Sequence, residues 1–264
     1  TKSAVFNIIA KTLTITAVDK TKVYDSAVYT PTDYTVTYDG FVGVEDESVL
    51  SGTITYTGTA IAATASGTYV ITPGGLTSSN YSITYVSGEL SISQRSINEA
   101  SIAAIADLVY TGSAQTVSPT VTFNSLNLVE GTDYTTSFAG NINVGTASIT
   151  LTGIGNYTGS KTQGFTITTK TLTITAIDKN KVYDSAVYTP TDYTVTYDGF
   201  VGVEDESVLS DTLSYTGTAI AATNSGTYVI TPGGLTSNNY SITYLSGELS
   251  ITQKPITIAI TNQT

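Results

Sequence analysis

Apolar and polar residues alternate with a period of two along most of the chain. Leu13 and Ile15 alternate with Thr12, Thr14 and Thr16, and the segments 34–38 and 81–85 alternate tyrosine, valine or isoleucine with threonine or serine. Successive side chains of a β-strand point to opposite faces of its sheet. The pattern therefore predicts short strands with one face in a core and the other in water.

Glycine-containing segments separate these strands. Residues 38–40, 73–75 and 86–88 each contain Gly, which adopts backbone angles that other residues resist, and each predicts a turn. Short strands at this spacing favour a small sandwich or barrel-like β domain. Residues 43–50 break the alternation, with acids early and apolar residues late, and predict one helical turn. A longer helix at that place would favour a β-grasp arrangement instead.

The chain repeats itself at an offset of 159 residues. The segment Lys11–Arg95 returns as Lys170–Lys254 with only 10 differences among its 85 positions. Near-identical copies in one chain are typical of arrays, in which each copy adds length. The segment between them is related in plan, because its residues 107–112, 131–135 and 155–159 echo residues 22–25, 31–35 and 79–82.

These repeats predict three tandem small β modules, Ig-like sandwiches or β-grasp-like, with at most one short helical turn each. The expected boundaries are residues 1–10 as the last strand of a preceding module, 11–95 as the first copy, 96–169 as the middle segment, 170–254 as the second copy and 255–264 as the first strand of a following module. The ends are set by register, since Phe6 falls opposite Phe165 and Lys254 opposite Arg95. The joints contain no flexible Gly/Ser tether, so we expect an elongated, stiff rod.

The two copies resemble the MBG-type repeats of bacterial cell-surface adhesins. The motifs that carry the resemblance are Lys22-Val23-Tyr24-Asp25, Gly67-Thr68-Tyr69-Val70-Ile71, Ser79-Asn80-Tyr81-Ser82-Ile83 and Gly88-Glu89-Leu90-Ser91-Ile92, with the same set 159 residues further on. The middle segment is similar to a related adhesin-stalk repeat, through residues 143–147 and 153–159. The resemblance implies an extracellular, multi-repeat protein of the bacterial cell surface and carries no catalytic residues over.

Composition excludes several classes of function. The chain has a formal charge of -11, which disfavours binding to nucleic acid or to anionic membrane surfaces. No apolar run reaches the length of about 18 residues that a membrane-spanning helix needs, so we expect no membrane insertion in this segment. Cys and His are both absent, which removes thiolate chemistry, the commonest proton-transfer group and His- or Cys-based zinc sites. We expect no catalytic residues, no cofactor and no metal.

Two acidic clusters are the remaining candidates for chemistry. Residues 45–47 and their copies 204–206 each place three carboxylates in a row. The favoured interpretation is a solvated, solubilising surface, and the alternatives are calcium binding or acid–base catalysis by paired carboxylates. The spacing does not match an EF-hand loop.

Tyrosine supplies the only candidates for ligand contact. Most of the 19 tyrosines belong to period-two strands and are expected to fill a core that has no Trp. Six lie near predicted loops or strand ends, where aromatic rings stack on sugars or anchor protein interfaces. They are Tyr24, Tyr29 and Tyr56, and their copies Tyr183, Tyr188 and Tyr215.

Two kinds of covalent modification have sequence signals. Asn80, Asn156 and Asn239 satisfy a glycosylation pattern, but all three occupy the same place in their segments, which favours a structural role at the start of a strand. A covalent bond between Lys11, Lys20 or Lys22 and an Asn or Asp, or between a Thr and a Gln, is a further hypothesis.

The sequence therefore predicts a non-enzymatic spacer of a bacterial surface adhesin or extracellular fibre, whose partners are the neighbouring repeats of the same polypeptide. Two alternatives remain open. The repeats bind glycan or a host surface protein through avidity, or the chain is a filament subunit that assembles by strand exchange.

Overall fold

A computed structural model describes residues 5–260, and these residues form an all-β protein. Strands β1 to β23 are joined by loops and by three- or four-residue 3₁₀ turns, and no α-helix occurs between residues 5 and 260. None of the helical segments in this range has the length and apolar character needed to cross a membrane. The expectation of an all-β fold is confirmed.

The chain divides into two compact units. Unit 1 contains the described residues up to Ala103 together with Thr120–Ser137 and Thr150–Thr162, and unit 2 contains Ala104–Pro119, Phe138–Ile149 and the described residues from Gln163 onward. The boundary passes through the middle segment. Each copy therefore shares a unit with part of the middle segment.

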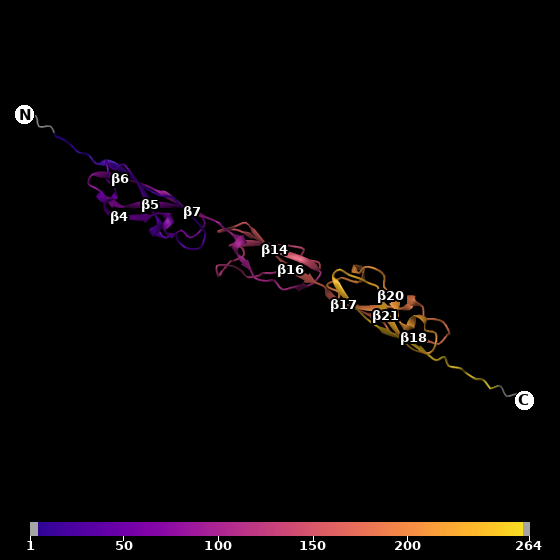
Figure 1. Ribbon diagram of the computed structural model, residues 1–264. Helices are drawn as coiled ribbons and strands as arrows, with labels where there is room; N and C mark the ends of the chain where they lie inside the picture. The colour runs from indigo at the N-terminus through magenta and orange to yellow at the C-terminus, as the bar shows by residue number, and fades with distance from the viewer. Residues whose placement is uncertain (1–4, 261–264) are drawn as a thin grey trace, which may run out of the picture. The chain divides into compact units, whose positions relative to one another are not determined.

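The first copy forms two sheets in unit 1. Its strands are β1 (Lys11–Ala17), β2 (Lys20–Val23), β3 (Val36–Asp39), β4 (Ser51–Thr57), β5 (Gly67–Thr77), β6 (Tyr81–Val86) and β7 (Gly88–Ser93). One sheet has the order β3-β1-β6 and the other the order β2-β7-β5-β4. Figure 1 shows β4, β5 and β7 side by side in this copy. The pairs β1–β6 and β2–β7 are parallel, and the other pairs are antiparallel.

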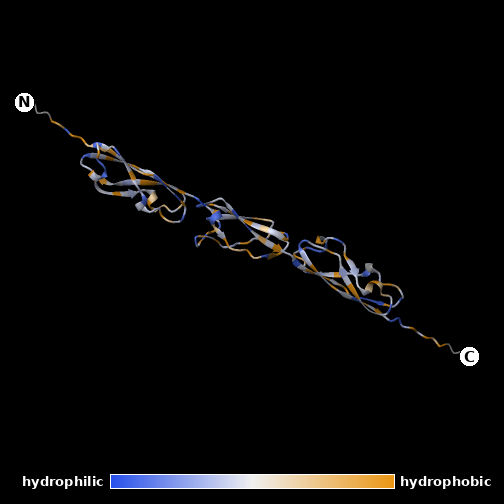
Figure 2. Ribbon diagram, in the orientation of Figure 1, coloured by the Kyte–Doolittle hydropathy of each residue, from blue (hydrophilic) through white to orange (hydrophobic). Residues whose placement is uncertain are grey.

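Period-two burial builds two hydrophobic clusters in this copy, one that contains Leu13 and Ile15 and one that contains Ile71 and Leu90. Leu13 and Ile15 of β1 are fully buried, and Thr14 between them is partly exposed. Ile71 of β5 and Leu90 of β7 are fully buried on the other sheet. Figure 2 shows the resulting alternation of hydrophobic and hydrophilic colour along the strands. The strands expected at residues 12–16 and 81–85 are confirmed.

The helical content differs from the expectation of at most one short turn per module. The first copy contains three 3₁₀ turns, η1 (Pro31–Asp33), η2 (Glu47–Val49) and η3 (Thr59–Ala62), of which only η2 was expected. Local signals favour the other two: Pro31 presets a turn-compatible φ, and Gly58 before η3 has a φ of 100°. Because η2 spans only three residues, the β-grasp alternative lacks the helix it requires.

The turn predicted at residues 73–75 was wrong. These residues lie within the eleven-residue strand β5, where Pro73 pairs with Tyr56 of β4. β4 is the edge strand of its sheet, and the register shifts between Gly52 and Thr55. Proline and glycine are tolerated at such irregular edge pairings, so Gly75, with a φ of 91°, accommodates a bulge and not a chain reversal.

The middle segment begins without a linker. It contains β8 (Arg95–Ser96), η4 (Ile97–Glu99), β9 (Ser101–Ile102), β10 (Leu108–Val109), β11 (Val121–Phe123), β12 (Leu126–Asn127), β13 (Tyr134–Ala139), β14 (Gly145–Gly153), β15 (Tyr157–Thr158) and β16 (Ser160–Thr168). The sheet orders are β10-β16-β14-β13, β12-β11-β9 and β15-β8. A single residue separates β7 from β8 and β16 from the next strand, which confirms the predicted absence of a tether.

The second copy repeats the first within unit 2. It contains β17 (Lys170–Ala176), β18 (Lys179–Val182), η5 (Pro190–Asp192), β19 (Val195–Asp198), η6 (Glu206–Val208), β20 (Ser214–Thr216), η7 (Thr218–Ala221), β21 (Gly226–Gly233), β22 (Tyr240–Leu245) and β23 (Gly247–Thr252). β20 is shorter than β4, and Asp211 occupies the place of Gly52 with a φ of 67°.

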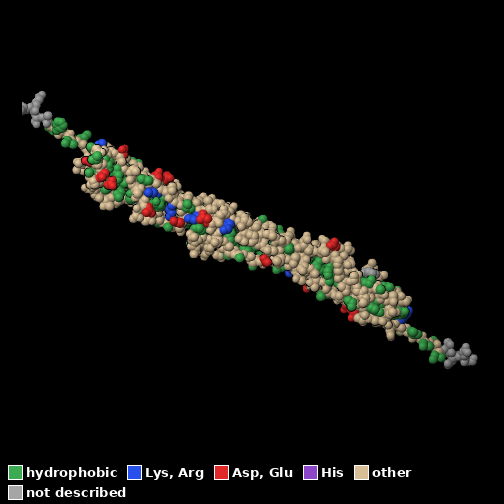
Figure 3. Space-filling model, viewed as in Figure 1, with side chains coloured by type: hydrophobic (Ala, Val, Ile, Leu, Met, Phe, Trp, Pro, Cys, Tyr) green, Lys and Arg blue, Asp and Glu red, His purple; other side chains and the backbone are tan. Residues whose placement is uncertain are grey.

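Both ends of the described chain lack strands. Residues 5–10 and 253–260 carry apolar side chains that contact little else, among them Phe6, which is 94% exposed, and Ile256, which is 87% exposed. Hydrophobic colour marks both segments in Figures 2 and 3. The outer residues of the two strands expected at 1–10 and 255–264, namely 1–4 and 261–264, lie outside the described residues.

Candidate functional site

The first candidate site is the joint between the first copy and the middle segment, which lies within unit 1. Tyr24 follows β2, and its main-chain N–H donates to the Ser93 carbonyl at 2.9 Å. The ring of Tyr24 meets the ring of Tyr157 edge-on, with centroids 5.5 Å apart and an interplanar angle of 79°. T-shaped aromatic pairs of this geometry add stabilisation beyond the area they bury. Burial raises the pKa of Tyr157, and the nearby Tyr24 adds to the shift.

An asparagine beside this pair fixes the joint. Asn156 Oδ1 accepts hydrogen bonds from the main-chain N–H of Ser66 at 2.8 Å and from its hydroxyl at 3.1 Å. Gln94 Nε2 donates to the Gly155 carbonyl at 2.8 Å. The amide of Asn156 thus satisfies a loop N–H that would otherwise lose a partner at the interface.

Arg95 connects the two sides of the joint. Its Nε donates to the Tyr24 carbonyl at 2.6 Å, and its guanidinium carbon lies 4.5 Å from the centroid of the Phe123 ring. The same side chain forms an ion pair with Glu99 at 2.5 Å. Its main-chain N–H donates to the Asn156 carbonyl at 2.9 Å, where β8 pairs with β15 in parallel.

The second candidate site is the joint between the middle segment and the second copy, within unit 2. Tyr110 and Tyr240 repeat the edge-on geometry, with centroids 5.6 Å apart and an interplanar angle of 83°. Asn239 Oδ1 accepts from the main-chain N–H of Val144 at 3.1 Å, and its Nδ2 donates to Asn143 Oδ1 at 3.2 Å. The two joints therefore use the same pair of devices: an edge-on tyrosine pair and an asparagine that receives a loop N–H.

Glu204 distinguishes the second joint from the first. Its Oε1 accepts a hydrogen bond from the Tyr110 hydroxyl at 2.6 Å, and its Oε2 accepts one from the Tyr240 hydroxyl. The Tyr240 hydroxyl also receives the N–H of Val201 at 3.0 Å. Burial and then the hydrogen bond to Glu204 raise the pKa of Tyr240 to about 12. The hydrogen bond to Glu204 is the main cause that raises the pKa of Tyr110.

The expectation that the acidic clusters are only a solvated surface was incomplete. Glu204 is partly buried under Tyr110, and its counterpart Glu45 accepts a hydrogen bond from Tyr81. The next acid, Asp46, caps η2 through a 2.9 Å hydrogen bond from the Ser48 N–H, and hydrogen bonding to Ser48, through its side chain first and then through its N–H, lowers the pKa of Asp46. Within residues 5–260, no three acidic side chains are placed to hold a metal ion.

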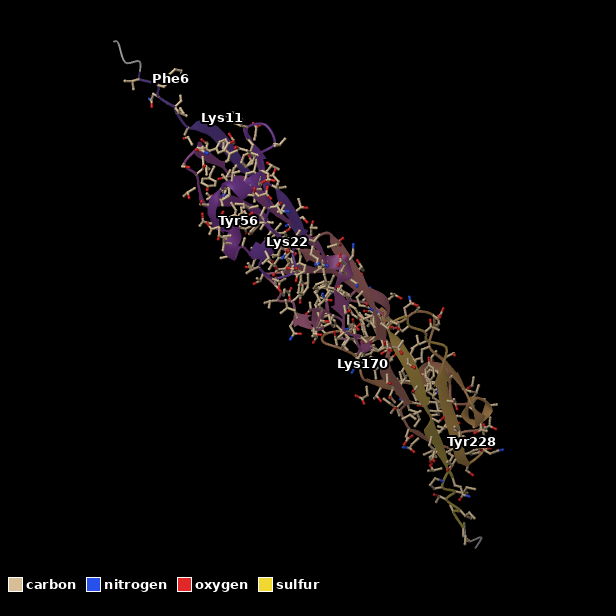
Figure 4. All side chains as sticks on the ribbon, turned by 60° about the vertical axis from the view of Figure 1, so that its left-hand side comes forward. Phe6, Lys11, Lys22, Tyr56, Lys170 and Tyr228 are labelled. Atoms are coloured by element: carbon tan, nitrogen blue, oxygen red, sulfur yellow. The ribbon has the colours of Figure 1, made fainter. Side chains whose placement is uncertain are left out.

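The six candidate tyrosines have different environments. Tyr29 and Tyr56 pack on either side of buried Tyr34, each with a centroid distance of 5.3 Å, and Tyr188 and Tyr215 repeat this arrangement around Tyr193. Figure 4 labels Tyr56 among the packed side chains of the first copy. These four tyrosines pack against the hydrophobic clusters of their copies, and Tyr56 and Tyr188 also line open surface pockets.

Tyr24 and Tyr183 are the pair that differs between the copies. Tyr24 is half-buried because Tyr157 contacts it, whereas Tyr183 is 38% exposed. The role of these six residues in ligand contact stays a prediction.

Lys22, one of the three candidates for a covalent crosslink, forms an ion pair. Its Nζ lies 2.6 Å from Asp25 Oδ1 and donates to the Ala27 carbonyl at 2.7 Å. Burial acts to raise the pKa of Asp25, but the hydrogen bonds from Lys22 and from the Ala27 N–H, together with the charges of Lys22 and Arg95, outweigh it and lower this pKa. Lys181 and Asp184 repeat the pair at 2.7 Å, so its position is a property of the copy.

Sequence reasoning identified the asparagines but not their partners. Asn156 and Asn239 were noted because they share one place in each segment, and that shared place was the signal of a common structural role. Tyr110 was noted only as an echo of Tyr24. The partner residues Ser66 and Val144 carry no signal of their own, because they act through main-chain N–H groups.

Comparison with known proteins places these repeats in a family. The model of the MBG domain (YGX type) matches residues 13–91 and again residues 172–250. No curated protein sequence is detectably similar to the chain.

Two solved structures match the chain at very low sequence identity. The chain is 9% identical to the structure of Sidekick-1 immunoglobulin domains 1-5, with a TM-score of 0.33. The matched region covers 94% of the present chain and 60% of the Sidekick-1 chain. The chain is 8% identical to the structure of the N-terminal four Ig domains of Dscam1 isoform 4.44, with a TM-score of 0.26. That match covers 93% of the present chain and 74% of the Dscam1 chain. The chain thus spans less than two thirds of the Sidekick-1 fragment.

The chain is a tandem-repeat β protein whose recurring contacts lie at the joints of its repeats. It belongs to the MBG domain family, in which its two copies are matched nearly end to end.

Proposed function

We propose that the chain is a non-catalytic spacer of a bacterial surface adhesin or extracellular fibre, and that it holds a distal binding region away from the cell. The observation that carries the proposal is the recurrence of one joint. An edge-on tyrosine pair and an asparagine that accepts a loop N–H occur at both ends of the middle segment. A spacer needs this property, because its reach depends on joints that resist bending.

The proposed organisation is three small β modules, with Ig-like sandwiches as their plan. Each strand that leaves one module enters the next after a single residue, so few backbone torsions are free to bend at a joint. Membership of the MBG family supports an extracellular location, since these repeats occur in surface proteins. Uncharged side chains and backbone make up most of the face seen in Figure 3. The charges that are present sum to a net charge of -11, which repels neighbouring chains within about 8 Å at physiological salt.

Small-angle scattering on chains of different repeat number tests the spacer role. The variants carry one, two or three tandem units of 159 residues, the repeat offset. We expect the maximum dimension to rise by the same increment with each added unit. A dimension that grows only as the cube root of mass contradicts the proposal. The matched control replaces Gln94 with a ten-residue Gly/Ser linker, which frees the joint and gives a broader distribution of dimensions.

The binding alternative depends on exposed tyrosine. Because four of the six candidates flank cores, Tyr24 and Tyr183 are the ones to test. A glycan array and a panel of host matrix proteins are probed with the chain and with a Tyr24→Ala, Tyr183→Ala double variant. Reproducible binding that the double variant loses favours this alternative over a passive spacer.

The exposed apolar ends favour a second candidate, the filament subunit. Phe6 is 94% exposed and Ile8 is 93% exposed, although their counterparts Phe165 and Ile167 are buried. Strand exchange between chains would cover such residues. Light scattering over a concentration series distinguishes the two functions, because a filament subunit gains mass with concentration and a spacer does not.

A further inference from the structure

A cleft at the end of the second copy has the form of an unfilled joint. Its volume is about 710 Å³, and Tyr183, Asn224, Ser225 and residues 253–257 line it. Tyr183 and Ser225 stand 159 positions after Tyr24 and Ser66, which form the first joint. The lining residues therefore correspond to the surface that Asn156 and Tyr157 cover in unit 1.

The cleft is already shaped to receive a partner. Tyr183 N–H donates to the Thr252 carbonyl at 2.8 Å, as Tyr24 N–H donates to Ser93 at 2.9 Å. The Tyr228 hydroxyl donates to the Asn224 carbonyl at 3.1 Å and holds the loop that carries Ser225. Tyr69 does the same in the first copy at 3.0 Å. Figure 4 shows Tyr228 toward the end of the second copy from which the C-terminal segment leaves.

The side chains at this end are exposed where their counterparts are covered. Tyr183 is 38% exposed, whereas Tyr24 is half-buried against Tyr157. Ile256 is 87% exposed, whereas Ile97, which occupies the same place after the first copy, is fully buried in the middle segment. An apolar residue of this kind gains free energy when a core encloses it.

Pro255 fits the pairing that the first joint uses. Arg95 N–H donates to the Asn156 carbonyl, and in a parallel pair the next residue of the strand points its N–H to the other side. Proline has no N–H to donate. Pro255 occupies the place of Ser96, whose N–H is not part of this pairing. The missing N–H of Pro255 therefore does not affect the hydrogen bond that the Lys254 N–H would donate in the place of Arg95.

We propose that this cleft is a docking surface for a β module of the same kind as residues 96–169. The occupant presents an asparagine oxygen to the Ser225 N–H and a tyrosine ring edge-on to Tyr183, and its core encloses Ile256. The inference rests on the proposed spacer function and names the chemistry by which the spacer extends. A module of the MBG kind is a poorer fit, because the first copy docks a middle-type module at the corresponding surface.

An extended chain tests the proposal. Residues 98–169 are fused a second time after Ile256, so that Pro255 and Ile256 keep the places of Ser96 and Ile97 and the second copy carries the same kind of neighbour as the first. Amide exchange at Ser225 and Ser66 is followed by NMR in the 264-residue chain and in the extended chain. We expect Ser225 to exchange faster than Ser66 in the shorter chain and to slow by about tenfold or more in the extended chain, because a new hydrogen bond protects it.

A matched variant isolates the asparagine. Replacing only the appended copy of Asn156 by Ala restores fast exchange at Ser225 and leaves Ser66 unchanged. A Ser225 amide that exchanges at one rate with and without the appended segment overturns the proposal. Failure of the spacer function is recognised separately, because a glycan or host-protein ligand found in the binding screens leaves the protection of Ser225 unaffected.

Discussion

The hydroxyl of Tyr110 donates a hydrogen bond to Oε1 of Glu204 across 2.6 Å, between residues that are 94 positions apart. Tyr110 belongs to the middle segment and Glu204 to the second copy. The carboxylate therefore joins two repeats, and it does so beside the edge-on contact of Tyr110 with Tyr240. In the first copy the Glu45 carboxylate accepts a side-chain hydrogen bond from Tyr81 and from no other side chain within residues 5–260, so the second bond depends on the neighbouring repeat.

Removing one hydroxyl tests the strength of that bond. Tyr110→Phe keeps the ring and deletes the donor to Glu204, and we expect the free energy of unfolding to fall by about 1–2 kcal/mol, since a hydrogen bond to a charged group is lost. Urea titration followed by circular dichroism measures the change. Tyr24→Phe is the control, because the Tyr24 hydroxyl has no hydrogen-bond partner within the described part of the chain, and we expect a change below about 0.5 kcal/mol. Equal losses in the two variants would contradict this account.

The raised pKa of Tyr240 predicts a loss of stability at high pH. Its folded pKa of about 12 lies above the ordinary value of 10.0, so the folded state keeps the phenolic proton when the unfolded state has lost it. The stabilisation is complete below pH 10 and is lost as pH rises from 10 through 12, with a slope of up to about 1.4 kcal/mol per pH unit.

Site-specific titration separates Tyr240 from the other tyrosines. NMR of the Tyr240 ring carbon gives its pKa directly, and Glu204→Gln, which removes the negative charge beside the hydroxyl, lowers that pKa toward 10. An unchanged pKa in this variant would mean that burial alone causes the shift.

Asn156 of the first joint has a counterpart at the same place in the first copy, Asn80, whose side chain forms no hydrogen bond to any residue between 5 and 260. Asn156→Ala leaves the part-buried Ser66 N–H without its acceptor, and we expect a loss of about 1–3 kcal/mol, the cost of leaving a desolvated donor unsatisfied. Asn80→Ala changes the same place in the first copy, where the side chain has no hydrogen bond to any residue between 5 and 260. We expect it to be close to neutral. Thermal unfolding of both variants and of the parent chain compares them, and a larger effect at Asn80 would be evidence against the joint.

A glycine marks the close approach at the second joint. Gly112 has a φ of 74°, and a Cβ there would lie 2.8 Å from Val201 Cγ2 and 3.4 Å from Glu204 Oε1. Gly202 has a φ of 58° and nothing within 4 Å of its Cβ position. Both Ala variants lose about 1–2 kcal/mol from left-handed backbone strain.

Only the Cβ added by Gly112→Ala also lies close to other side chains, those of Val201 and Glu204 in the second copy. We therefore expect Gly112→Ala to destabilise unit 2 more than Gly202→Ala does. Chemical denaturation of the two variants gives the difference. Indistinguishable midpoints would show that Val201 and Glu204 move aside without cost.

The local features of the fold were predictable because each depends on neighbouring residues. Alternation at residues 12–16 gave β1, and the acidic segment before Ser48 gave η2. The turn predicted at residues 73–75 was wrong because Pro and Gly signal irregular backbone in general. Whether that irregularity reverses the chain or bulges a strand depends on the partner, here β4.

The joints were predictable in part. Repeat register located them, and the shared place of Asn156 and Asn239 indicated a common role. The partners were not visible in the sequence, because Ser66 and Val144 contribute main-chain N–H groups that every non-proline residue has. Glu204 looked like a surface acid because its sequence neighbours are exposed acids.

The sequence by itself determined the β class, the repeat length and the direct passage of one segment into the next, since periodicity and register are local properties of the chain. The tertiary structure decided which groups meet. Tyr24 with Tyr157 and Tyr110 with Glu204 come together only after parallel and antiparallel pairing has fixed the register of strands far apart in sequence. A hydrogen bond or a ring contact needs placement within a few tenths of an ångström, and that precision comes from packing, which no periodic pattern contains.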